Sequence, residues 1–287
     1  MNHQQSKLRF DQKLLLILVK NVWILPAIMS AIIIAGCFVP YIISVHYERV
    51  YPILPYISDA GAQLPAAPYF SQILDFGGVI VIIVFWLRFV QINYYLTVMI
   101  AEPSESIDME KQSKTTTTEN KKLIKRLHLR NMIALIFGVI GGFGIISVGN
   151  FRDTENLTLH NTSVIVMVAA FSVLMIENII IAYHLNQKFH IESCPITWII
   201  LKIITFIFII NLLISLIILF RKNHKALLDS DKRANWQPNM DGYPIHLSCT
   251  ISEYIFFITY SLIFLIFAKR FYQFKQWDKT FFKYLLN

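Results

Sequence analysis

The sequence predicts an all-α, polytopic membrane protein: a single bundle of six transmembrane helices with both termini in the cytosol. Six apolar runs of 19 to 25 residues are separated by polar connections. Hydrophobic residues make up 55% of the 287 residues and charged residues 15%, whereas ordinary globular domains carry roughly 25% charged residues. The connections leave no room for a separate soluble domain, so residues 1–287 are expected to form one membrane domain.

Each apolar run is long enough to cross a bilayer as a helix. A helix rises about 1.5 Å per residue, and the hydrocarbon layer is about 30 Å thick. Backbone amides in lipid must form their hydrogen bonds internally, which makes helices the expected structure. The predicted spans cover residues 22–44, 71–91, 131–149, 162–183, 196–220 and 247–268.

The distribution of positive charge predicts the orientation. With six spans, both tails share one side with the connections between spans two and three and between spans four and five. That side carries 17 of the 26 Lys and Arg residues and the other side 7, while Arg88 and Lys202 lie inside spans. The positive-inside rule therefore places both termini in the cytosol. The basic connection between Arg221 and Arg233 opposes this trend.

Two kinds of processing motif fit this topology. Asn156 and Asn161 each begin an N-x-[ST] sequon in the connection between spans three and four, so N-glycosylation is predicted on the lumenal side. Glu119, followed by Leu123 and Ile124, fits an acidic dileucine sorting motif in a predicted cytosolic connection.

The two long connections have opposite compositions. Residues 46–70 contain four prolines with aromatic residues between them, which favours an ordered lumenal loop because prolines reduce unfolded-chain entropy and aromatic rings supply area to bury. Residues 97–129 are polar with few apolar anchors, which predicts a disordered cytosolic loop.

Span three contains a glycine pair suited to helix packing. Gly138 and Gly142 form G-x-x-x-G, which lets a second helix backbone approach closely. A nucleotide-binding glycine loop is excluded, because no soluble strand precedes the motif.

Ionisable residues inside spans are costly, so each is expected to have a partner or a cavity. The topology predicts a lumenal-side polar cluster of Asp59, Asp75, Asn150, His246 and Glu253. It also predicts a buried ion pair in the cytosolic half, formed by Glu177 with Lys202 or with Arg88. Two interpretations of the lumenal-side cluster stay open: it bonds the bundle together, or His246 and Glu253 sense protons or a ligand.

No catalytic signature is evident. The chain has no H-E-x-x-H motif, no G-x-S-x-G motif and no paired metal-ligand set. We therefore expect no catalytic residues, no metal and no cofactor. Membrane lipids are the expected partners, together with proteins of the same membrane, and nucleic acid is not.

Several motifs together resemble one family. These are Pro55-Tyr56-Ile57-Ser58-Asp59 with Asp75 and Arg88 downstream, Gly149-Asn150-Phe151 at the end of span three, and Trp236-x-Pro238 followed by Tyr243-x-x-His246 and Ser252-Glu253-Tyr254. Over roughly residues 22–275 the chain resembles the damage-regulated autophagy modulator (DRAM) family. It departs from the usual pattern in a longer loop at 102–122, in Glu177 and in Tyr254.

The resemblance implies six helices with cytosolic termini, a lysosomal or other endomembrane location, a role in promoting autophagy and no enzymatic activity. The wider superfamily keeps two alternatives open. One is a Golgi or ER factor that remodels glycosylphosphatidylinositol (GPI) lipids, in which Asp59, Asp75, His246 and Glu253 act on headgroups. The other is a plasma-membrane scaffold for a lipid-kinase complex. A transporter is disfavoured because no inverted repeat is evident.

Overall fold

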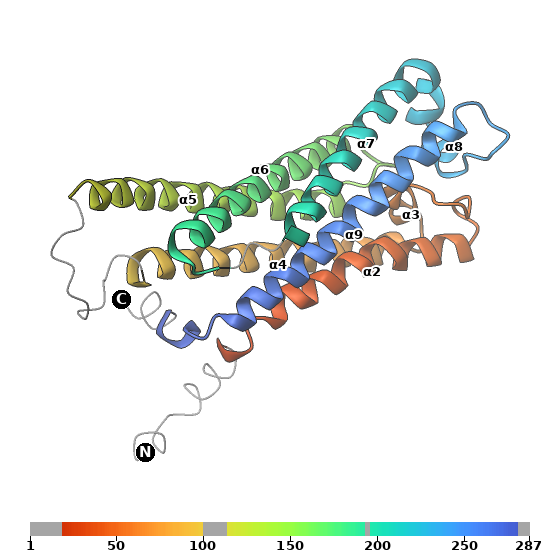
Figure 1. Ribbon diagram of the computed structural model, residues 1–287. Helices are drawn as coiled ribbons and strands as arrows, with labels where there is room; N and C mark the ends of the chain where they lie inside the picture. Colours follow the sequence, from red (N-terminus) through yellow and green to blue (C-terminus); the bar gives the residue numbers. More distant parts are fainter. Residues whose placement is uncertain (1–18, 100–113, 193–195, 281–287) are drawn as a thin grey trace, which may run out of the picture.

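The computed structural model describes residues 19–99, 114–192 and 196–280, and every regular element within them is a helix (Figure 1). Six of the described helices are long and apolar enough to cross a membrane, so the predicted class and number of spans are confirmed. The long helices are α2 (Ile24–His46), α4 (Ala67–Tyr94), α5 (Lys114–Asn150), α6 (Leu157–Phe189), α7 (Ile196–Leu228) and α9 (Tyr243–Gln273). Shorter elements include α3 (Ile57–Ala62), the π-helix η2 (Tyr95–Met99) and α8 (Ser230–Ala234).

The long helices lie side by side in one bundle (Figure 1). Helix α4 packs against α2 and α5, and α6 packs against α5. Helix α9 packs against α2 and α7. Helix α2 begins and α9 finishes at one end of the bundle, which we call the terminus end, whereas α3 and α8 lie at the other, which we call the cap end.

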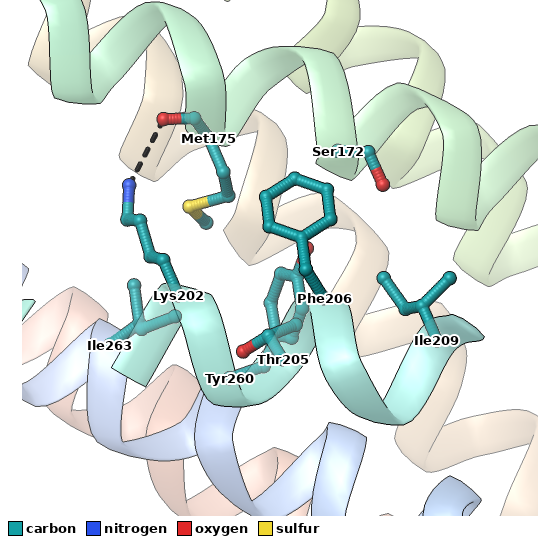
Figure 2. Close-up of a pocket in the computed structure, with 8 residues that line it drawn as sticks. All are labelled: Ser172, Met175, Lys202, Thr205, Phe206, Ile209, Tyr260 and Ile263. Carbon is teal, nitrogen blue, oxygen red and sulfur yellow. Dashed lines mark hydrogen bonds between the residues drawn. The ribbon is translucent and has the colours of Figure 1, made fainter. Parts of the chain in front are cut away.

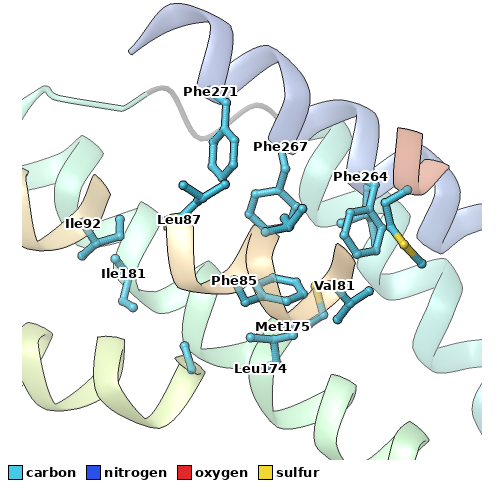
Figure 3. Close-up of a cluster of buried hydrophobic side chains, with 14 of the residues drawn as sticks. Val81, Phe85, Leu87, Ile92, Leu174, Met175, Ile181, Phe264, Phe267 and Phe271 are labelled. Atoms are coloured by element: carbon cyan, nitrogen blue, oxygen red, sulfur yellow. The ribbon is translucent and has the colours of Figure 1, made fainter. Parts of the chain in front are cut away.

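The main core lies where α4, α6 and α9 face one another (Figure 3). Phe85 of α4 meets Phe264 and Phe267 of α9 with ring centroids 5.9 and 5.6 Å apart, in edge-on arrangements that aromatic rings prefer. Leu174 of α6 is fully buried on the same cluster. In contrast, α7 exposes a long row of isoleucines, and Ile207 is 57% exposed. This row is the face that lipid would cover.

Glycines set the distance between α4 and α5. A Cβ at Gly78 would lie 2.6 Å from the carbonyl oxygen of Gly142, and a Cβ at Gly142 would lie 2.9 Å from that of Gly78. A Cβ at Gly138 would meet the Cβ of Phe85 at 2.8 Å. Both glycines of the G-x-x-x-G motif therefore face α4, and Gly78 is the partner that the motif alone does not reveal.

The predicted disordered connection at 97–129 is wrong where the structure describes it. The π-helix η2 covers residues up to Met99, and α5 begins at Lys114; residues 100–113 lie outside the described residues. The reason is an apolar stripe within the polar sequence: Leu127 is fully buried, and Leu123 and Ile124 pack against the main core. Their spacing places all three on one helical face, which tertiary packing stabilises.

The proline-rich connection at 46–70 contains α3, whose residues are mostly buried. Ser44 Oγ donates a 2.7 Å hydrogen bond to the carbonyl oxygen of Ala60, which ties α3 to the end of α2. The backbone N–H of Tyr51 donates to the carbonyl oxygen of Ala234 at 2.8 Å, which ties the same loop to α8. These bonds hold α3 and α8 against each other as a cap on the bundle.

Candidate functional site

A buried charge cluster holds the cap end together. We call Asp59, Asp153 and Arg233 the cap cluster. Arg233 donates from Nε and Nη2 to Asp59 Oδ1 at 2.8 and 2.6 Å, and Nη2 also donates to Asp153 Oδ2 at 2.6 Å. All three side chains are at least nine-tenths buried. The cluster therefore connects three separate segments by charge-assisted bonds.

Local structure positions each member of the cap cluster. Asp59 lies in the first turn of α3. Asp229 caps α8 by accepting from the N–H of Lys232 at 3.2 Å, and this short helix presents Arg233. Asp153 lies in the turn between α5 and α6, where His160 Nδ1 is 2.8 Å from the carbonyl oxygen of Phe151.

The cap cluster has more acid than base, since two carboxylates share one guanidinium. Asp59 Oδ2 and Asp153 Oδ1 are buried and form no hydrogen bond among the described residues. Burial raises the pKa of Asp59 well above its ordinary value; Arg233 opposes this shift, while Asp153 adds to it. A buried carboxylate that shares its counter-ion with a second carboxylate holds a proton unusually well.

An aromatic group surrounds the predicted histidine at the same end. The imidazole of His246 stacks on Trp236 with centroids 4.8 Å apart, and Tyr56 meets it edge-on at 5.0 Å. His246 Nδ1 and the Tyr56 hydroxyl are buried and form no hydrogen bond among the described residues. Seven residues farther along α9, Glu253 Oε2 accepts a hydrogen bond from the backbone N–H of Ile57 at 3.0 Å. This bond holds the start of α3 against α9.

The five residues of the predicted lumenal-side cluster do not converge on one point. Asp59, His246 and Glu253 lie under the cap, linked through the residues at the start of α3. Asp75 and Asn150 form a separate, partly exposed pair between α4 and α5, in which Asn150 Nδ2 donates to Asp75 Oδ1 at 2.6 Å. The sequence placed all five at the correct end but did not reveal Asp153 and Arg233, which lie in connections.

A second buried charge cluster lies toward the terminus end. We call Arg88, Glu192 and Arg270 the terminus cluster. Arg88 forms two bonds to Glu192, from Nη1 to Oε1 at 2.5 Å and from Nη2 to Oε2 at 2.8 Å. Arg270 Nη1 donates to Glu192 Oε2 at 2.9 Å. Gln91 Oε1 accepts from Arg88 at 2.7 Å, and Asn186 Nδ2 donates to the Glu192 carbonyl at 2.7 Å.

The terminus cluster has more base than acid. Burial by itself would raise the pKa of Glu192, but Arg270 and Arg88 outweigh it and lower that pKa to about 2. Glu192 therefore stays ionised and pins the connection between α6 and α7 to α4 and α9.

The predicted ion pair among Arg88, Glu177 and Lys202 is wrong. Arg88 binds Glu192, while Glu177 binds the half-exposed Arg130 at 2.8 Å. Lys202 Nζ donates to the carbonyl oxygen of Met175 at 3.0 Å. Hydropathy placed these residues in the correct half of the bundle, but lateral pairing depends on which helices touch. Glu192 gave no signal of its own, because it lies in a short polar connection.

A small pocket lies between α6, α7 and α9, near the middle of the bundle (Figure 2). Its empty volume is about 220 Å³, part of it open to the outside. Lys202 reaches across one edge to Met175, and Tyr260 forms part of the floor. The lining contains no carboxylate and no imidazole, and its polar side chains are those of Ser172, Lys202, Thr205 and Tyr260. Among the described residues no group of His, Cys, Asp or Glu is arranged to hold a metal ion.

The processing motifs lie in helices. Asn156 is the N-cap of α6 and accepts from the N–H of Leu159 at 3.0 Å, while Asn161 is exposed in the first turns of the same helix. Glu119 is exposed near the start of α5, but Leu123 and Ile124 are partly buried against the core. Glycosylation of the two asparagines and sorting by this motif stay predictions.

Six helices that are long and apolar enough to span a membrane, joined by two buried charge clusters, define a polytopic membrane protein. The comparison with family models is more specific. The model described as "Frag1/DRAM/Sfk1/Cwh43P N-terminal domain" matches residues 21–274. The chain therefore belongs to this family, and the resemblance found in its motifs is confirmed.

Curated relatives match along most of their length. DNA damage-regulated autophagy modulator protein 2 of Homo sapiens is 24% identical over 243 residues, covering 80% of this chain and 80% of the relative. The Bos taurus protein of the same name is 23% identical, covering 84% and 82%. DNA damage-regulated autophagy modulator protein 1 of Xenopus laevis is 24% identical, covering 86% and 89%. No solved structure matches the chain significantly.

Proposed function

We propose that this protein promotes or modulates autophagy as a non-enzymatic, multi-pass protein of an endolysosomal membrane. The observation that carries the proposal is the extent of the match: relatives named as autophagy modulators align over about four-fifths of both chains. A shared fragment would align over one part only. The buried charges support a structural role, because both clusters are occupied in holding helices and connections together.

The proposed orientation places both tails in the cytosol and the cap end in the lumen. Its support is the excess of Lys and Arg on the tail side, 17 against 7. The basic connection after α7 opposes this less than its count suggests, because Arg233 is neutralised inside the cap cluster. Lumenal exposure of the cap end predicts a glycosidase-sensitive mass that is lost when Asn156 and Asn161 are both changed to Gln. A cap end accessible to an impermeant label from the cytosol would contradict it.

Two surfaces support the proposed work as a scaffold or a lipid-interacting modulator. The exposed isoleucine row of α7 offers an apolar face to lipid tails. On α5, Lys121, Lys122, Lys125 and Arg126 are exposed on the face turned away from the core. Basic residues at an anionic membrane surface each contribute about 1 kcal/mol to binding. Membrane lipids are therefore the first proposed partners, and autophagy proteins at the same membrane are the second.

Genetic rescue tests the proposal. Cells that lack the chain should show slower autophagic flux, measured as turnover of a lipid-anchored autophagosome marker with and without lysosomal inhibition. Full-length wild-type chain should restore the flux, and imaging should place it with lysosomal markers. A matched variant tests whether lipid contact by α5 is needed for this function. It has Lys121, Lys122, Lys125 and Arg126 changed to Gln. Normal flux in cells without the chain would refute the proposal.

A second candidate function is remodelling of GPI lipids in the early secretory pathway. Asp59, His246 and Glu253 favour it, because they bring acids and an imidazole together under the cap. This candidate predicts an altered lipid composition of GPI-anchored proteins in the same cells. A plasma-membrane scaffold for a lipid-kinase complex predicts surface location instead.

A further inference from the structure

The cap cluster contains a charge imbalance that its geometry can resolve. The same Nη2 atom of Arg233 lies 2.6 Å from Asp59 Oδ1 and 2.6 Å from Asp153 Oδ2. These two oxygens are thus no farther apart than twice that distance, and Asp153 is close enough to raise the pKa of Asp59. The remaining oxygens, Asp59 Oδ2 and Asp153 Oδ1, are buried without a donor among the described residues.

We infer that Asp59 and Asp153 form a proton-binding site: the two carboxyl groups hold one proton between them and thereby lock the cap onto the bundle in acid. Uptake of one proton converts one carboxylate to a carboxylic acid, whose O–H donates to the other carboxylate. The cluster then changes from one net negative charge to none. No bond other than this O–H forms, and no co-reactant is needed. The site belongs to the folded chain itself and does not depend on the proposed function.

The surroundings on every side favour the proton. From α8, Arg233 is the single cation of the cluster, and it already serves both carboxylates. From α9, Glu253 brings a further acid that interacts with Asp153 and Arg233, and His246 lies in the aromatic stack on Trp236. From the loop before α3, the Tyr56 hydroxyl is buried near Asp59. One guanidinium thus faces three carboxyl groups.

The sign of the pH effect follows from the shift at Asp59. Its pKa in the folded chain is raised, mainly by burial and further by Asp153, against the pull of Arg233. The folded chain therefore binds this proton more tightly than the unfolded chain does. The resulting stability is fully present below the unfolded pKa and is lost as pH rises through the folded pKa. Because the cluster joins α3, α8 and the turn between α5 and α6, the cap as a whole should tighten in acid.

Thermal unfolding of the purified full-length chain in nanodiscs tests this inference at about pH 5 and about pH 7.5. Wild type should melt at a higher temperature at the lower pH. Asp59→Asn should lose most of that difference, because the amide supplies a permanent donor to Asp153. Asp75→Asn is the matched control, since Asp75 is an acid at the same end that pairs with Asn150 instead, and it should keep the wild-type response. An equal response in wild type and Asp59→Asn would overturn the inference.

Infrared difference spectroscopy provides a second readout, which reports protonation of the carboxyl groups directly rather than through stability. Acidification of wild type should produce a carboxylic-acid C=O band, which Glu253→Gln should retain and Asp153→Asn should shift or remove. No such band, or a band lost only in Glu253→Gln, would overturn the inference. A rise in melting temperature on adding CaCl₂ at neutral pH, abolished in Asp59→Asn, would also overturn it, because the pair would then be a cation site.

Discussion

The two buried charge clusters use the same chemistry with opposite stoichiometry. Among the described residues, two carboxylates share one guanidinium at the cap end, and two guanidiniums share one carboxylate at the terminus end. Burial opposes ionisation in both places. It prevails at Asp59, whose pKa is raised, and it is outweighed at Glu192, whose pKa falls to about 2. The pKa values of these two buried acids thus shift in opposite directions, and the acids differ in the number of guanidiniums that they bind.

Removal of Arg233 should cause the largest loss of stability among the changes that test this comparison. Arg233→Met leaves Asp59 and Asp153 buried together without a counter-ion, which costs about 3–5 kcal/mol near neutral pH. The loss should shrink in acid, because both carboxyl groups can then take up protons. Chemical unfolding at two pH values measures both effects. Lys232→Met is the control, since its pair with Asp229 is exposed and its loss should be near neutral.

Removal of the acid from the terminus cluster should give a comparable or slightly smaller loss with a different pH profile. Glu192→Gln removes the carboxylate that Arg88 and Arg270 both bind, and about 3 kcal/mol of stability should be lost. Because the folded pKa of Glu192 is about 2, its contribution is complete above the unfolded value and is lost only as pH falls toward 2. The loss should therefore be the same at about pH 5 and about pH 7.5. A loss that changes between these values would contradict the contrast.

A packing variant separates charge from general destabilisation. Gly142→Val places a side chain against Gly78 and Ile82 at the contact between α4 and α5. Overpacking of this kind costs about 1–3 kcal/mol. The melting temperature should fall equally at both pH values, so the difference between them should match wild type. A changed difference in melting temperature between the two pH values would mean that the pH response depends on helix packing rather than on protonation of the cap cluster.

The smallest effect is expected at the partly exposed ion pair. Arg130 and Glu177 have side chains that are 37% and 13% exposed. Solvent screens such a pair, so Arg130→Met should cost about 0–1 kcal/mol. A loss of stability as large as that of Glu192→Gln would contradict the expectation that exposed ion pairs contribute less stability than buried ones.

Hydropathy predicted the six spans and the end at which each polar residue lies, because a bilayer constrains length and composition strongly. It did not predict lateral pairing: Glu177 and Lys202 were expected to pair, and they bind Arg130 and the Met175 backbone instead. Three of the most deeply paired charges, Asp153, Glu192 and Arg233, lie in connections. A charged residue in a connection is expected to be exposed to solvent, and the sequence alone does not indicate that the fold buries it. The stripe of Leu123, Ile124 and Leu127 was overlooked for a similar reason, since polar neighbours dilute it.

Helix α5 is longer than a membrane span requires. Its 37 residues correspond to about 55 Å, whereas a hydrocarbon layer is about 30 Å thick. The helix begins beyond the ends of α4 and α6 (Figure 1), so tilt alone does not absorb the surplus. We therefore expect the first turns of α5 to project past the neighbouring helices on that side of a membrane.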